Sequence, residues 1–185
     1  MSQTIQANSS ADLSQPVMGT FREAMRRLAA SVMIVSSRDT DGTPHGMVAS
    51  SVISVSMEPA SMLIAVNRNA GIHPVLLRSK KFCINLLSDE QGELLKPFST
   101  TALRDQRFKS DRWCDAWTTD GGRLPWLPDA SASIECDVEV VTEYGTHSLF
   151  IGRVRQVHCA TASEATPATT APLVWLAGQQ VALSL

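Results

Sequence analysis

Hydroxyl and apolar side chains share one extended segment between Pro44 and Ser56. Valine and isoleucine favour the half-buried surface of a β-sheet, whereas serine hydroxyls form hydrogen bonds that water or a ligand can complete. Because side chains alternate between the two faces of a strand, neither face of this segment is purely apolar or purely polar. The segment predicts a strand that builds a ligand site or, as the alternative, an ordinary barrel strand that tolerates serine. The hydroxyls belong to Ser50, Ser51, Ser54 and Ser56.

His147 is the second feature that suggests chemistry. An imidazole titrates near neutral pH, but a single histidine on a strand is more often structural than functional. The chain has no glycine-rich dinucleotide fingerprint between a strand and a helix, no P-loop and no nucleophile elbow. These absences argue against a Rossmann unit and against hydrolase chemistry. No metal site is expected, since the cysteines lack zinc-ligand spacing: Cys83, Cys114, Cys136 and Cys159.

The elements that would position these residues are mostly strands. Short turns join the first three apolar runs, which favours an antiparallel sheet over a doubly wound one. A later pair of long runs meets at a turn that contains Gly145 and predicts a hairpin. The sequence therefore predicts a mainly β fold with flanking helices. The expected strands are residues 32–37, 44–56, 61–66, 80–87, 131–143 and 147–159.

A first helix is predicted from Thr20. The Thr20 hydroxyl can cap the first turn, and Glu23 completes a capping-box pattern. Phe21, Met25 and Leu28 recur at helical spacing and form an apolar face. The basic residues of the same helix are expected to form a solvated face rather than a phosphate-binding stripe. They are Arg22, Arg26 and Arg27.

The length of the chain and the order of its expected elements predict one domain. A chain of 185 residues can bury a single core, so residues 18–185 are expected to form one domain behind a mobile arm at residues 1–17. Short helices are expected at residues 73–77 and 89–98, the second capped by Ser88. Residues 99–130 form a long irregular segment, and such loops often line or cover a site.

Composition and charge argue against several classes of protein. The chain is 44% hydrophobic and 18% charged, as in ordinary globular proteins, and its net charge of −2 favours neither nucleic acid nor an acidic membrane. No apolar run reaches the roughly 20 residues of a membrane span. The first residues lack the features of a signal peptide, so we expect reduced thiols and a cytoplasmic location.

Several short motifs, taken in order, resemble the short-chain flavin reductase family. The resemblance covers roughly residues 20–176. It implies an antiparallel, FMN-binding split β-barrel that forms a homodimer with flavin near the subunit interface. It also implies that NADH or NADPH reduces FMN or FAD, and that the reduced flavin leaves for a partner monooxygenase. The motifs lie at residues 21–27, 45–51, 58–59, 67–69, 73–74, 82–87, 145–154 and 172–175.

The resemblance also implies a set of site residues. His147 would bind or orient the nicotinamide, while the residues around the serine-bearing strand would wall and hydrogen-bond the flavin. Alternatives remain for three of them: Arg68 as a solvated surface charge, His73 as a helix-start residue, and Asn85 as a buried amide that ties two loops. The implied flavin-binding residues are Met47, Val48, Ala49, Ser50, Ser51, Asn67, Arg68, Asn69, His73, Asn85, Leu86 and Leu87.

Two departures from the family pattern bear on flavin affinity. Ile72 stands where a hydroxyl residue is common, and residues 176–183 are uncharged where the family often has an aromatic and basic pattern. Weak affinity would suit a flavin handled as a substrate. Two other functions remain open at this point: a carrier that retains its flavin, and an interaction barrel that has lost it.

Overall fold

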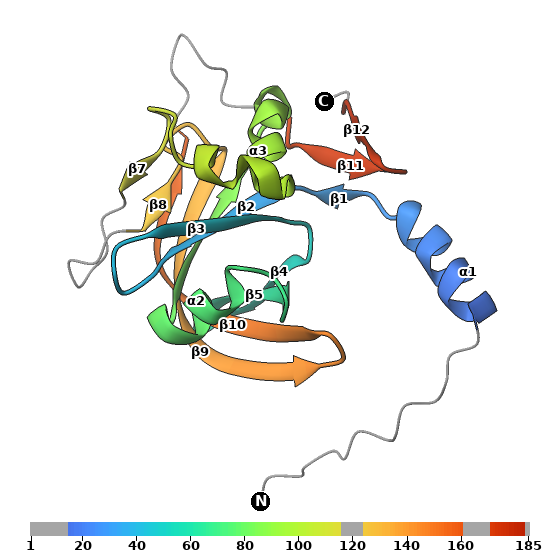
Figure 1. Cartoon of the computed structure of the whole chain (residues 1–185), viewed down its shortest axis with the longest axis horizontal. Helices are drawn as coiled ribbons and strands as arrows, with labels where there is room; N and C mark the ends of the chain where they lie inside the picture. The colour runs from blue at the N-terminus through green and yellow to red at the C-terminus, as the bar shows by residue number, and fades with distance from the viewer. Residues whose placement is uncertain (1–14, 116–123, 161–170, 184–185) are drawn as a thin grey trace, which may run out of the picture.

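The computed structural model describes residues 15–115, 124–160 and 171–183. Its main feature is a seven-stranded sheet in the order β3-β2-β6-β9-β10-β5-β4 (Figure 1), and every neighbouring pair is antiparallel. The prediction of a mainly β, antiparallel fold is confirmed. The strands are β2 Met33–Arg38, β3 Pro44–Ala49, β4 Val52–Met57, β5 Ala60–Asn67, β6 Lys81–Leu86, β9 Ala132–Tyr144 and β10 His147–Cys159.

The serine-bearing segment differs from its prediction as one continuous strand. It forms two strands, β3 and β4, and only Ser50 and Ser51 separate them. β3 and β4 nevertheless occupy opposite edges of the sheet. Two consecutive strands can lie at opposite edges only if the sheet curls until those edges approach each other. The dipeptide Ser50-Ser51 therefore joins the two edges of an open barrel, in agreement with the predicted split barrel.

Apolar side chains fill the barrel and pack a second cluster against its outer face. The interior cluster includes Val35, Ile64, Phe82 and Phe150, with Phe82 and Phe150 fully buried. Gly152 is required here, since a Cβ at this position would lie 2.7 Å from the Phe82 ring. The outer cluster packs beneath the short helix α3, Leu95–Ser99. Its buried residues are Val32, Ile34, Leu87, Leu95, Phe98, Leu127, Ala130 and Leu173.

The first helix, α1 Gln15–Arg26, starts earlier than predicted. Thr20 lies inside the helix and is not its cap, so the capping-box prediction with Glu23 is wrong. The helix also begins inside the predicted arm, whose residues 1–14 lie outside the described part of the chain. Its apolar face is exposed, with Phe21 at 62% and Met25 at 46%. Figure 1 shows α1 projecting from the barrel.

The C-terminal segment forms a small sheet beside α1. The hairpin of β11, Val174–Leu176, and β12, Gln179–Val181, pairs with β1, Ala30–Ser31. Its turn contains Ala177 and Gly178, both with positive φ. The Ala177 N–H donates to the Arg26 carbonyl oxygen at 2.8 Å, which attaches this turn to the end of α1.

The remaining helices are short. Helix α2 is His73–Ser79, and the predicted helix at 89–98 forms as a 3-10 turn, η1 Asp89–Leu94, followed by α3. Ser88 precedes η1 as predicted, and its N–H donates to the Gln91 side chain at 3.0 Å. Within the described ranges, no helix combines the length and the apolar character that crossing a bilayer requires.

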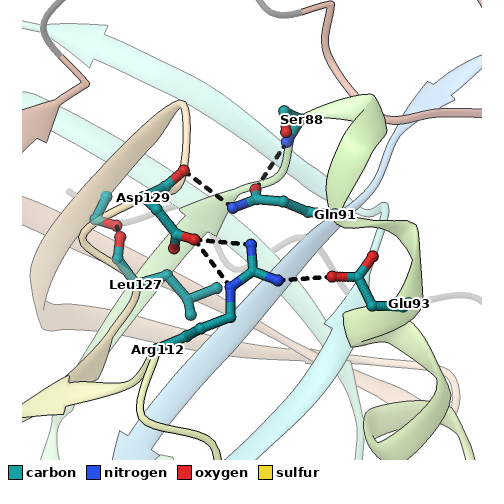
Figure 2. A network of polar contacts seen from close by, with 7 residues as sticks. Ser88, Gln91, Glu93, Arg112, Leu127 and Asp129 are labelled. Atoms are coloured by element: carbon teal, nitrogen blue, oxygen red, sulfur yellow. Dashed lines mark hydrogen bonds and ion pairs between the residues drawn. The ribbon is translucent and has the colours of Figure 1, made fainter. Parts of the chain in front are cut away.

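The long segment after α3 is attached by charged and polar contacts. It contains η2 Thr101–Gln106, β7 Cys114–Asp115 and β8 Pro125–Trp126, while its residues 116–123 lie outside the described part. Figure 2 shows Arg112 binding both Asp129, at 2.7 Å, and Glu93, at 2.6 Å. Gln91 also donates to the Asp129 carbonyl oxygen. These contacts attach the segment to η1 at Arg112 and at Asp129.

Candidate functional site

Three of the predicted site regions meet at one end of the barrel. The Ala65 N–H donates to the Ser51 carbonyl oxygen at 3.0 Å, and His147 pairs with Asn67 in the register of β10 and β5. Two residues along a strand span about 7 Å, so Ser51 lies close to Asn67 and His147. We call the group of Ser50, Ser51, Asn67, Asn69 and His147 the strand-end site.

The strand-end site offers hydrogen-bonding groups that the protein itself does not use. Ser50 and Ser51 are exposed, and their hydroxyls make no hydrogen bond to the described residues. His147 is partly exposed, and its Nδ1 lies 2.9 Å from the Thr146 hydroxyl oxygen. This contact leaves Nε2 available for a ligand. A flavin needs such donors and acceptors along its ring edge and ribityl chain, so these residues fit it.

Arg68 lies beside this site but is held by the hairpin of β9 and β10. Its guanidinium donates to the Glu143 carboxylate and to the Gly145 carbonyl oxygen, both at 2.8 Å. Asn67 Oδ1 accepts the Asn69 N–H at 2.9 Å and shapes the turn after β5. Arg68 is therefore a positioning residue that fixes the hairpin turn before His147.

His73 is a buried structural residue. Its Nε2 lies 2.9 Å from the Ser148 hydroxyl oxygen, and its ring meets the Phe150 ring edge-on with centroids 5.5 Å apart. It is only 8% exposed. These contacts favour the alternative role at the start of α2 over flavin binding. The neighbouring Ile72 packs in the barrel core, so its side chain is also turned away from the surface.

The three residues predicted to wall the flavin ring do not share one face. Met47 and Ala49 pack against the interior cluster, whereas Val48 packs against the outer cluster. The alternation of side chains along β3 explains this division. Their side chains therefore do not line one face together, and their contact with the flavin ring stays a prediction.

Asn85 occupies the centre of a buried polar network. Its Nδ2 donates to the Ile34 carbonyl oxygen at 3.0 Å, and its Oδ1 accepts the Leu127 N–H at 2.9 Å and the Ser133 hydroxyl at 3.1 Å. Asn85 is fully buried. Its amide ties the segment after β8 to strands β2 and β9, which is the structural role kept open as the alternative.

The neighbours of Asn85 are also occupied by the fold. The Leu86 carbonyl oxygen accepts the Ser131 N–H, and the Leu87 carbonyl oxygen accepts the Leu173 N–H, each at 2.9 Å. The Leu86 side chain packs against the interior cluster and Leu87 belongs to the outer one. The end of β6 thus supports the barrel wall rather than presenting side chains to the strand-end site.

A cavity of about 670 Å³ opens next to the strand-end site. Ser50 and Ser51 line both, but neither Asn67 nor His147 lines the cavity. The sequence did not indicate that α1 lines a cavity, because the arginines of this helix were expected to form a solvated face. The lining residues are Arg22, Met25, Arg26, Leu28, Ala30, Val32, Val48, Ser50, Ser51, Leu95, Ser99, Trp175, Ala177 and Gly178.

The two buried thiols are poor candidates for nucleophiles. Burial raises the pKa of the Cys136 thiol to about 12, and it raises the pKa of Cys83 further above the usual range. Cys114 and Cys159 are exposed, and all four cysteines are free. Among the described residues, no group of histidine, cysteine and acidic side chains has the arrangement of a metal site.

Comparison with known proteins agrees with this geometry. The sequence profile of the flavin reductase like domain matches residues 25–184. The reductase component of an FADH2-dependent resorcinol hydroxylase from Rhizobium sp. (strain MTP-10005) is 38% identical over 165 residues, covering 89% of this chain and 86% of that protein. An NADH:riboflavin 5'-phosphate oxidoreductase from Streptomyces pristinaespiralis is 32% identical over 166 residues, covering 89% and 88%.

The solved structures lead to the same family. Flavin reductase PheA2 in its native state matches with a TM-score of 0.72 and 28% identity, covering 90% of this chain and 98% of that one. The family profile spans well over half of the chain, and both relatives exceed 30% identity over most of their length. The chain therefore belongs to the flavin reductase like domain family.

Proposed function

We propose that the chain is an NAD(P)H-dependent flavin reductase that binds FMN or FAD at the strand-end site and supplies reduced flavin to a partner monooxygenase. The convergence of Ser50, Ser51, Asn67 and His147 at the meeting point of the barrel edges carries the proposal. Family membership supports the reaction, and the resorcinol hydroxylase relative, itself named a reductase component, supports the partner.

The residues of the strand-end site have separate tasks. The unused hydroxyls of Ser50 and Ser51 bind the ribityl and phosphate oxygens of the flavin, and Asn67 and Asn69 bind from the facing turn. A bound flavin supplies the ring that accepts a hydride from C4 of the nicotinamide. His147 orients the nicotinamide carboxamide through Nε2, while Thr146 holds its Nδ1. The protein thus contributes alignment rather than proton transfer.

We also propose that the enzyme is a homodimer with the flavin near the subunit interface. The barrel edge at β4 exposes a row of large apolar side chains, with Met57 at 83%, Ile53 at 58% and Val55 at 47%. Apolar surface of this kind is typical of a protein interface. β4 begins directly after Ser51, so a partner on this edge would reach the site. Sedimentation velocity tests it: an Ile53→Asp variant should be monomeric, and an unchanged dimer would exclude this edge.

Steady-state oxidation of NADH and NADPH tests the reaction. The protein is assayed through the near-ultraviolet absorbance of the reduced nicotinamide, with FMN, FAD, riboflavin or no flavin added. The expected result is turnover that rises and saturates with free flavin. A protein that co-purifies with tightly bound flavin and gives no turnover with free flavin would instead be an electron carrier. A protein without affinity for any flavin would be an interaction barrel.

A further inference from the structure

The cavity beside the strand-end site has a polar floor and an apolar wall. Ser50 and Ser51 contribute the floor, where the proposed flavin site ends. Helix α1, helix α3 and the turn between β11 and β12 enclose the remainder. Its volume of about 670 Å³ lies within the range of about 300–1,000 Å³ that is typical of small-molecule sites.

Two arginines of α1 line this cavity. Arg22 and Arg26 are four residues apart, so their side chains lie above one another on the helix. Arg26 is anchored, because its Nη2 donates to the Ala177 carbonyl oxygen at 3.2 Å. Arg22 makes no hydrogen bond or ion pair with the described residues. Arg22 therefore lines the cavity without a counter-ion from the described residues.

Arg27 differs from these two residues. Its Nε lies 3.8 Å from the Glu23 carboxylate, and it does not line this cavity. The arginines of α1 thus divide between a paired, solvated residue and two residues that face the cavity.

The remaining wall suits a flat aromatic group. Trp175 from β11 lines the cavity and is 38% exposed, so part of its ring is available for stacking. Val48, Leu95 and Met25 add apolar contacts. A ligand that matches this wall and the free guanidinium combines an aromatic ring with an anionic group.

We propose that this cavity binds the adenylyl half of FAD, so that Arg22 and Trp175 make the enzyme prefer FAD to FMN. The inference depends on the proposed function, which places the ribityl phosphate at Ser50 and Ser51. The cavity adjoins that point, and His147 does not line it. The second phosphate of FAD would meet Arg22, and the adenine would stack on Trp175. FMN lacks both groups and leaves the cavity unused.

Calorimetric titration with FAD and FMN tests this preference without any turnover. The wild-type protein should bind FAD more tightly than FMN. Since a hydrogen bond to a charged group contributes on the order of 1.5–3 kcal/mol, Arg22→Gln should weaken FAD binding about tenfold or more. Its FMN affinity should stay within about twofold, because the interaction energy lost is with a phosphate that FMN does not have. Trp175→Leu should show the same selectivity, and AMP alone should compete with FAD but not with FMN.

Arg27→Gln is the matched control, because it removes the same charge from the same helix outside the cavity. It should leave both affinities unchanged. Equal losses of FAD and FMN affinity in Arg22→Gln would overturn the proposal, because the cavity would then hold a part that both flavins share. Unchanged affinities together with a changed sedimentation coefficient would also overturn it and identify a protein interface. Absent turnover with normal FAD selectivity would instead contradict only the proposed reductase function.

Discussion

Histidine, asparagine and serine occur both at buried positions of the fold and at the strand-end site, with opposite consequences. At the buried positions, Asn85 and His73 use their side-chain polar atoms for hydrogen bonds within the protein, to Leu127 and Ser148 among others. At the strand end, Ser50 and Ser51 have hydroxyl groups that the described chain leaves unused. Residue type therefore does not identify a ligand site. The difference is whether the side chain already forms its hydrogen bonds within the protein.

Replacing Asn85 should give the largest effect on stability. Asn85→Ala removes the side-chain acceptor for the Leu127 N–H, one of the two acceptors of the Ser133 hydroxyl, and the donor to the Ile34 carbonyl oxygen, all in a buried network. Each buried polar group left without a partner costs about 1–3 kcal/mol, so the free energy of unfolding should fall by about 3 kcal/mol or more. Urea denaturation followed by circular dichroism measures this change.

Asn69→Ala is the matched control for Asn85, because the exposed Asn69 contributes only its backbone N–H to the turn after β5. Its unfolding free energy should stay within about 0.5 kcal/mol of the wild type. If both variants were equally stable, the buried positions and the strand-end site would not differ in the way described, and Asn85 would again be a flavin-binding candidate.

Replacing His73 should give the second-largest loss of unfolding free energy, after Asn85. His73→Phe keeps a ring against Phe150 but removes the bond to Ser148, whose hydroxyl is buried. The free energy of unfolding should fall by about 1.5 kcal/mol, while flavin affinity stays unchanged. A double-mutant cycle with Ser148→Ala measures the pair directly, since the second substitution should add little once the first is made. A large loss of flavin affinity with normal stability would assign His73 to the site instead.

The sequence predicted the barrel well because strand periodicity and turns are local signals. The strands near residues 32–37, 61–66 and 80–87 lie close to β2, β5 and β6. The cavity could not be found in this way. Arg22 and Arg26 have the helical spacing of any solvated pair. Their place beside the cavity depends on a long-range contact, that of Arg26 with Ala177, which the sequence does not show. The sequence left two roles open for Asn85, because the partners that decide between them lie far away in the chain.

His147→Ala tests the role of the strand-end site. Loss of one hydrogen bond to the nicotinamide should reduce kcat/KM for NADH about tenfold, with unfolding free energy unchanged. His158→Ala is a control from the same strand, since His158 packs on Trp126 with ring centroids 4.8 Å apart and does not belong to the strand-end site. Steady-state kinetics at saturating flavin measures both. An unchanged KM and turnover in His147→Ala would exclude His147 from nicotinamide binding.

The smallest effect on stability is expected at Asp39. Its carboxylate contacts α2 at the surface, whereas His73 anchors the same helix through a buried contact. The Arg78 guanidinium bonds to both carboxylate oxygens, at 2.7 and 3.2 Å, and keeps the pKa of Asp39 near 2, below its usual 3.8. A carboxylate with a lowered pKa stabilises the fold above the unfolded-state pKa, and this contribution is lost as the pH falls from about 4 to about 2. Asp39→Asn should therefore be slightly less stable than the wild type at neutral pH, and the difference should shrink in acid.

Urea midpoints measured across this pH range, with and without added salt, test the contact. Asp41→Asn is a useful comparison, because hydrogen bonds from Thr43 lower the pKa of Asp41 and no guanidinium does. Added salt should reduce the stability difference caused by Asp39→Asn more than the one caused by Asp41→Asn, since only Asp39 forms an ion pair with a guanidinium. A difference between Asp39→Asn and the wild type that stayed constant down to about pH 2 would show that the ion pair does not stabilise α2. The buried contact of His73 with Ser148 would then be the interaction that fixes this helix beside the strand-end site.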